Sequence, residues 1–248
     1  MTRTPRRWLA AIGVASALVA APAWAARPLD TEDTETLEPG KAELQLSGDF
    51  TRGSGDNLWG AGGVLSLGLL PRLEGRVESA LLLFEPEGER ARGRIGDTLF
   101  GFKYRILDEA VSFPAVLAQL TLTLPTGDGA LGLGPGGVDV GLLAAVSKTF
   151  GPIRLTWNGG YTFVTQDRNL DFWRLSASVE YLASKAWLLV GEVVSALAAE
   201  KTAEFAVLRV GAVYAISERI RLDGAVGFGL TRPSPDVILT VGVTISLF

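Results

Sequence analysis

The chain has no cysteine and no histidine among its 248 residues. Without cysteine it cannot form disulfides, thiolate metal sites or a lipid anchor on a cysteine. Without histidine it cannot use a Ser-His-Asp site or a histidine general base. A hydrolase with paired carboxylates is disfavoured as well: Glu74 and Glu78 share a strand face, but Arg76 lies between them and favours ion pairing. The sequence therefore predicts no enzyme, no metal and no cofactor.

The chain also lacks any uncharged apolar run of the roughly 20 residues that a spanning helix needs. Its start instead shows the three parts of a secretory signal. Three early arginines precede a short apolar run over 8–21, and Ala23-Trp-Ala25 is a small-x-small cleavage site. We expect a signal peptide over 1–25, cleaved before Ala26, rather than a membrane anchor.

Excess positive charge is absent too. The 23 basic and 27 acidic residues give a formal net charge of −4, so an acidic exported protein is a poor candidate for binding nucleic acid. After residues 26–40, which are polar, acidic and bounded by Pro and Gly, a period of two in polarity begins. We expect 26–40 to form an extended periplasmic N-terminal segment.

Alternation of apolar and polar residues then continues to the end of the chain. In the segment 153–163, for example, Trp157 and Tyr161 fall on one face, whereas Arg154 and Asn158 fall on the other. Such segments are expected at 41–50, 57–70, 73–84, 94–106, 114–124, 138–150, 153–164, 172–183, 187–196, 204–215, 219–230 and 237–248.

The gaps between these segments alternate between short and long, as the periplasmic turns and outer loops of a bacterial barrel do. The predicted fold is therefore all-β: a transmembrane antiparallel up-and-down β-barrel of about 12 strands over 41–248, with both termini on the periplasmic side. Ten or fourteen strands remain possible. A soluble β-sandwich also alternates, but the export signal, the loop asymmetry and the many outward large residues disfavour it. The last residue, Phe248, is out of phase with the final strand.

If the apolar phase faces lipid, the opposite phase lines the lumen, because an outward Arg or Lys at the bilayer midplane costs about 2–4 kcal/mol. Besides Glu74 and Arg105, this inward phase gives the following lumen candidates: Arg76, Glu78, Asp97, Lys103, Asp139, Arg154, Asn158, Arg174, Glu180, Glu192, Arg209, Arg221 and Asp223. Opposed charges could select a solute in a polar pathway. They could equally form an ion-pair network that fills a narrow barrel.

Several segments resemble one known family. The segments 113–128, from Phe-Pro-Ala to Leu-Pro-Thr-Gly-Asp, and 136–142 with 147–151, resemble two of its consecutive strands. Asn158-Gly-Gly-Tyr161 is similar to its "N-x-G-Y" strand, and 33–40 is similar to its lead-in. The family is that of the meta-pathway phenol degradation proteins, described as transporters. The resemblance implies an outer-membrane barrel with a role in the passage of aromatic or other small compounds.

Together, these patterns predict a channel or transporter in the outer membrane of a Gram-negative-type cell. It would allow passive uptake of small molecules, with aromatic or hydrophobic compounds as candidates. The alternative is a structural or assembly barrel with an occluded lumen. The expected partners are outer-membrane lipid and a small-molecule solute, and the oligomeric state is left open.

Overall fold

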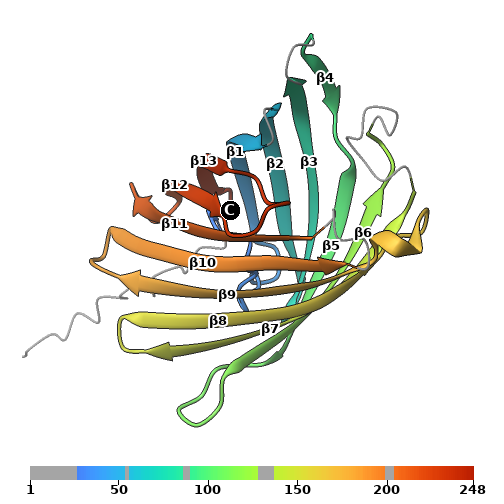
Figure 1. The fold of residues 1–248 in the computed structure, drawn as a ribbon. Helices are drawn as coiled ribbons and strands as arrows, with labels where there is room; N and C mark the ends of the chain where they lie inside the picture. Colours follow the sequence, from blue (N-terminus) through green and yellow to red (C-terminus); the bar gives the residue numbers. More distant parts are fainter. Residues whose placement is uncertain (1–26, 54–55, 86–89, 128–136, 199–203) are drawn as a thin grey trace, which may run out of the picture.

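The protein forms a closed antiparallel β-barrel (Figure 1). The computed structural model describes residues 27–53, 56–85, 90–127, 137–198 and 204–248, so the expected signal peptide lies outside the described residues. Strands that follow each other along the chain are paired, except that two consecutive segments pair with the same strand, and β13 (Val237–Ser246) closes the ring by pairing with β1 (Ala42–Gly53). No helix among the described residues is long and apolar enough to cross a membrane.

The strand boundaries follow the expected ones within a few residues. Between β1 and β13 the elements are β2 (Asp56–Leu70), β3 (Leu73–Glu85), β4 (Arg92–Ile95), β5 (Thr98–Leu107), β6 (Ala115–Leu124), β7 (Asp139–Phe150), β8 (Ile153–Phe163), the 3-10 turn η2 (Arg168–Leu170), β9 (Phe172–Leu182), β10 (Trp187–Ala198), β11 (Phe205–Ala215) and β12 (Ile220–Gly229).

Thirteen labelled strands make a twelve-stranded barrel because β4 and β5 share one position in it. The first half of β3, residues 73–78, pairs with β5, and its second half, residues 81–84, pairs with β4 along the same edge. Between them the chain leaves the ladder at Gly96 and Asp97, where Gly96 N donates to Ala80 O and Asp97 Oδ1 accepts from Gly127 N. The prediction of a 12-stranded up-and-down barrel is therefore confirmed, and the expected strand at 94–106 is interrupted near its start.

The strand faces are apolar outside and polar inside. On β8, Arg154, Thr156 and Asn158 are buried in the barrel, whereas Trp157 is 48% exposed on the outer surface. Arg154 is directly opposite Glu180 on β9, so the same phase continues across the ladder. A soluble sandwich would show the reverse distribution, with its apolar face buried.

Most of the short connections lie at one end of the barrel and most of the longer ones at the other; the exceptions are residues 54–55 between β1 and β2 at the second end and residues 108–114 between β5 and β6 at the first. Two of the short ones are two-residue turns that contain a left-handed residue, Arg72 with φ 68° and Gly151 with φ 61°. Glycine suits such a φ because it has no Cβ. At the C-terminus, β13 ends at Ser246 and not at residue 248 as expected, so Phe248 lies beyond the strand and its phase has no bearing on the barrel.

The N-terminal region differs from the expectation of an extended periplasmic segment. Residues 27–37, which we call the lumen segment, run inside the barrel without regular secondary structure. The segment leaves the barrel close to β2, where Gly40 N donates to Gly68 O. A Cβ on Gly68 would overlap the carbonyl oxygen of Glu38, so only glycine permits this close crossing. The sequence showed the polarity of this segment but not where its charges would bind.

Candidate functional site in the barrel lumen

The lumen segment is held by side chains of the wall. Among the described residues, no backbone–backbone hydrogen bond joins residues 27–37 to a strand. Basic side chains of the wall bind carboxylates and carbonyls of the segment, whereas wall carboxylates accept its backbone N–H groups. The lumen is thus complementary in charge to a peptide that has acidic side chains.

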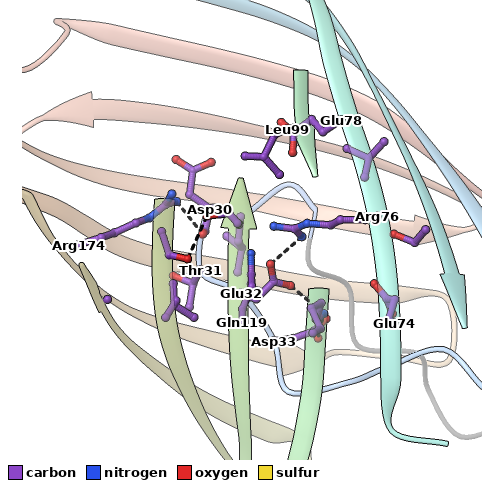
Figure 2. A pocket seen from close by; sticks show the side chains of 18 of the residues that line it. Asp30, Thr31, Glu32, Asp33, Glu74, Arg76, Glu78, Leu99, Gln119 and Arg174 are labelled. Atoms are coloured by element: carbon purple, nitrogen blue, oxygen red, sulfur yellow. Dashed lines mark hydrogen bonds and ion pairs between the residues drawn. The ribbon is translucent and has the colours of Figure 1, made fainter. Parts of the chain in front are cut away.

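Glu32 lies at the centre of the first contact group (Figure 2). Arg76 Nη1 donates to its Oε2 at 2.7 Å, and Lys103 Nζ lies 2.8 Å from its Oε1. With its amide oriented to suit both neighbours, Gln119 donates to Glu32 Oε2 at 2.9 Å and accepts from Arg76 at 2.7 Å. Asn158 binds the backbone N–H and C=O of Glu32.

These contacts determine the charge state of Glu32. Burial raises the pKa of its carboxyl, but the charges of Arg76 and Lys103 and their hydrogen bonds outweigh burial and lower the pKa below its ordinary 4.5. Glu32 is therefore a carboxylate at neutral pH.

Glu192 and Arg209 form the second contact group, on β10 and β11. Glu192 accepts from the backbone N–H of Asp30 and from both N–H and Oγ1 of Thr31, at 2.7–3.1 Å. Arg209 binds the carboxylate of Asp30 through both of its terminal nitrogens and also contacts Glu192 at 3.0 Å. Arg174 adds a hydrogen bond to the carbonyl of Asp30.

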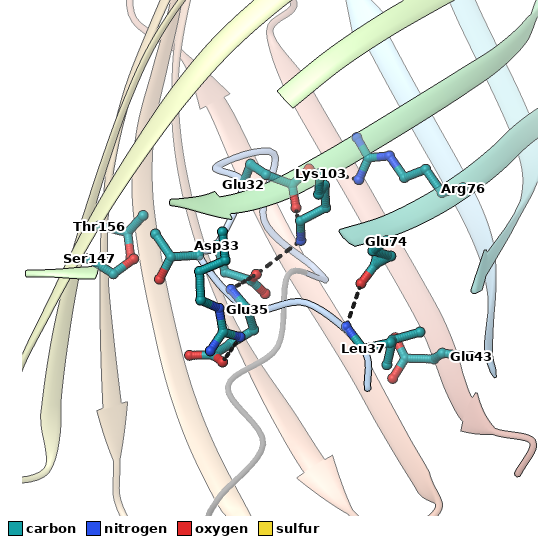
Figure 3. A network of polar contacts seen from close by, with 12 residues as sticks. Glu32, Asp33, Glu35, Leu37, Glu43, Glu74, Arg76, Lys103, Ser147 and Thr156 are labelled. Carbon is teal, nitrogen blue, oxygen red and sulfur yellow. Dashed lines mark hydrogen bonds and ion pairs between the residues drawn. The ribbon is translucent and has the colours of Figure 1, made fainter. Parts of the chain in front are cut away.

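The third group lies nearer the short turns. Arg154, which is 2% exposed, donates to Thr34 Oγ1 and to Glu35 at 2.8 and 2.9 Å. Arg105 binds the other oxygen of Glu35, and Lys103 reaches Asp33 at 3.1 Å (Figure 3). Together, these bases hold two further acids of the segment.

The two ends of the segment are fixed differently. Arg27 pairs with Asp223 on β12 at 3.2 Å and donates to Thr240 on β13. Near the other end, Leu37 N donates to Glu74 on β3. Between them Leu29 packs against an apolar cluster of the wall that contains Leu188, Val190 and Val213. The segment therefore contacts strands from β3 to β13 and crosses the lumen.

A cavity of about 820 Å³ remains beside the segment. Its lining combines segment residues with wall residues such as Thr121, Thr123, Leu99 and Leu143. Asp139, at the start of β7, shows that the cavity extends toward the long-loop end. The barrel interior is therefore partly filled and partly open space.

All thirteen lumen candidates occur in described parts of the chain, but the structure gives them different settings. Those that contact the lumen segment are Arg76, Lys103, Arg154, Asn158, Arg174, Glu192, Arg209 and Asp223. Those that line the cavity without such a contact are Glu78, Asp139 and Arg221, the last bound to Glu43. Glu180 is buried opposite Arg154, and Asp97 lies at the break between β4 and β5, bound to Gly127.

Sequence reasoning missed the acids of the segment itself. The sequence places Asp30, Glu32, Asp33 and Glu35 in the expected extended periplasmic segment, whereas in the structure they are partners of the inward bases. Gln119 was missed because its strand, β6, contains no charged residue that would draw attention to its inward face. A signal was available in the acidic run of residues 30–35, which matches the row of basic residues on the inward phase.

A closed antiparallel barrel with an apolar outer face and a charged interior defines the class of outer-membrane β-barrels. The chain belongs to the family described as "Putative MetA-pathway of phenol degradation", whose model matches residues 25–247. No curated protein matches the chain.

Solved outer-membrane channels share this fold. The COG4313 outer membrane channel from Pseudomonas putida F1 superimposes with a TM-score of 0.69 at 18% identity, covering 88% of this chain and all of that chain. The KdgM porin in complex with disordered oligogalacturonate gives 0.60 at 11% identity, covering 83% and 99%. The CymD monoaromatic hydrocarbon channel gives 0.51 at 10% identity, covering 85% and 89%. At these identities the likeness establishes the fold.

Proposed function

We propose that the protein is an outer-membrane channel for the passive passage of small molecules, with the long loops facing outward. The observation that carries this proposal is the 820 Å³ cavity enclosed by the barrel wall and bordered by opposed charges. Such a wall binds a polar or charged solute weakly at several points, as conduction requires. The fold it shares with known channels and porins supports the same reading.

Aromatic compounds are the first solutes to examine. The family description refers to phenol degradation, and one solved relative in fold is a monoaromatic hydrocarbon channel. Leu99 and Leu143 supply apolar surface among the polar groups of the cavity. An aromatic solute with one polar group would match this mixed lining.

The lumen segment favours a second candidate, a structural barrel that stays closed. Its contacts with nine of the strands span the lumen near the level of Glu32 and Glu192. In this alternative, the ion pairs would serve stability alone.

Planar-bilayer conductance of the purified protein separates the two candidates. The channel proposal expects discrete conductance steps and a greater open probability after deletion of residues 27–37. A barrel that conducts neither with nor without these residues, although it is folded, would be a structural one. Swelling of liposomes in phenol and in benzyl alcohol, compared with protein-free liposomes, then tests the solute class.

A further inference from the structure

The surroundings of Glu32 have the geometry of a binding site for a free carboxylate. Arg76, Lys103 and Gln119 reach its two oxygens within 2.7–2.9 Å from three neighbouring strands, β3, β5 and β6. We propose that these three side chains, the carboxylate clamp, bind the carboxylate of a small solute, and that Glu32 occupies the clamp as an internal stand-in. This inference rests on the proposed channel function and deepens it.

The barrel wall, rather than the segment, shapes the clamp. Lys103 and Gln119 are direct partners in the β5–β6 ladder. Arg76 on β3 is the ladder partner of Gly101 on β5, and its side chain extends over this glycine. A Cβ at position 101 would come 2.8 Å from the Arg76 side chain. The missing side chain at Gly101 thus allows Arg76 to reach toward Gln119 and the lumen.

The donors of the clamp point at the lumen and not at acids of their own strands. Glu74 and Glu78 flank Arg76 on β3, yet among the described residues neither forms an ion pair with Arg76 or Lys103. Glu74 instead accepts from the backbone of Leu37. When Glu32 is lost, Lys103 keeps Asp33 as a partner, but Arg76 and the buried Gln119 lose the carboxylate oxygen that accepts from both of them.

A solute carboxylate can replace the carboxylate of Glu32 in the clamp without disruption of the barrel wall. The lumen segment has no backbone ladder to break, since side chains alone attach residues 27–37 to the strands. Glu32 and all three clamp residues border the cavity, so a solute that enters it meets the clamp directly. A carboxylate in the cavity therefore competes with Glu32 for the same donors.

The rest of the solute is defined by what lies beside the clamp. Leu143 on β7 is the ladder partner of Gln119 and borders the cavity. Thr121, which follows on the same face of β6, adds a hydroxyl. The class of ligand that fits is a small monocarboxylate with an apolar body, for which benzoate is the probe and benzyl alcohol the uncharged analogue.

Calorimetric titration of the detergent-solubilised protein tests the clamp. Glu32→Gln removes the internal carboxylate and keeps its size, and should raise the affinity for benzoate about tenfold or more, the effect of freeing a charged hydrogen-bonding site. In that background Arg76→Gln should abolish the gain. Arg221→Gln is the matched control, because Arg221 lines the same cavity but binds Glu43 on β1, and it should retain the gain.

The Glu32→Gln background also limits the risk of misfolding, because in the described part of the chain Glu32 is the carboxylate that pairs with Arg76, and it is already neutral when Arg76 is replaced. The clamp is disproved if benzoate binds Glu32→Gln no more tightly than benzyl alcohol, or if Arg76→Gln and Arg221→Gln reduce binding equally. Bilayer conductance keeps the two proposals apart. Benzoate binding without conductance retains the clamp and rejects the channel, whereas conductance without benzoate binding does the opposite.

Discussion

At the scale of single residues, the polar interior consists of charges with more than one partner. Glu192 is 3% exposed and has contacts with Asp30, Thr31 and Arg209 at the same time. Arg209 likewise binds both Asp30 and the carbonyl of Pro28. Since buried charges are costly unless they are paired and hydrogen-bonded, removal of one member affects the others.

Glu192→Gln is the first test of this coupling. The amide keeps the shape but loses the charge and one acceptor, so we expect the docking of the lumen segment to weaken by about 1–3 kcal/mol. Removal of a negative charge from the interior should also shift the small-ion preference toward anions. Reversal potential in a salt gradient measures the shift. Glu218→Gln, in an exposed short turn, is the control and should leave the potential unchanged.

The lowered pKa of Glu32 predicts how docking responds to acid. A carboxyl whose pKa is lower in the folded protein contributes stability above its ordinary value, 4.5, and loses that contribution as the pH falls through the lowered pKa. We therefore expect the segment to stay docked at pH 5 and to loosen only well below pH 4.5. A spin label at Thr36, beside the cavity, should gain mobility only in that acidic range. Loosening between pH 7 and pH 5 would show that docking is controlled by a group other than Glu32.

At the scale of elements, the strands were predictable because a barrel imposes a strict period. Each strand of β8 to β10 must present apolar groups to the outside and polar groups to the inside, so its phase is visible in the sequence alone. The break between β4 and β5 shifts the phase by one residue, since Ile95 and Phe100 both lie on the outer face. It was not visible because β4 has only four residues, Arg92–Ile95, which are too few to establish a phase of their own. The position of the lumen segment was hidden for another reason: its contacts are made by isolated side chains without any period.

The register predicts which positions meet lipid. On β9, Leu175 and Val179 are exposed on the outer face, whereas Ser176 and Ser178 are buried. Spin labels at the first pair should be broadened by lipid-soluble oxygen, and labels at the second pair should be spared. The chain has no cysteine, so each introduced one is labelled uniquely. Equal broadening at all four positions would contradict the register.

The crossing at Gly68 predicts a specific effect of one methyl group. Gly68→Ala forces the backbone at Glu38 to move, because the new Cβ would overlap a carbonyl that cannot rotate away. We expect a destabilisation of about 1–3 kcal/mol in the docking of the segment, with the barrel itself retained. Gly191→Ala, whose Cβ would have ordinary contacts at 3.7 Å, is the matched control. Limited proteolysis of the N-terminal region would distinguish them: faster cleavage of the control than of Gly68→Ala would refute the crossing.

At the scale of the whole molecule, the interior combines two kinds of design. The wall belongs to a fold shared with a porin solved in complex with oligogalacturonate and with a monoaromatic hydrocarbon channel, while the lumen of this protein holds a segment of its own chain. Class, topology and strand number were therefore predictable from patterns common to the fold. The pairing of the interior charges was not predictable. It is determined by the path of the lumen segment, and that path depends on contacts with many strands at once.

The path of the lumen segment also has a consequence for the order of folding. Arg27 reaches Asp223 and Thr240, 196 and 213 positions further along the chain, and Asp30 reaches Glu192, 162 positions away. Contacts this distant form slowly, because the intervening chain must first be ordered. We therefore expect the residues nearest the N-terminus of the described chain to dock among the last. They dock after the C-terminal strands have paired and closed the barrel. Docking of the segment reports that closure is complete, and a barrel that lacks β12 or β13 would leave Arg27 without its partners.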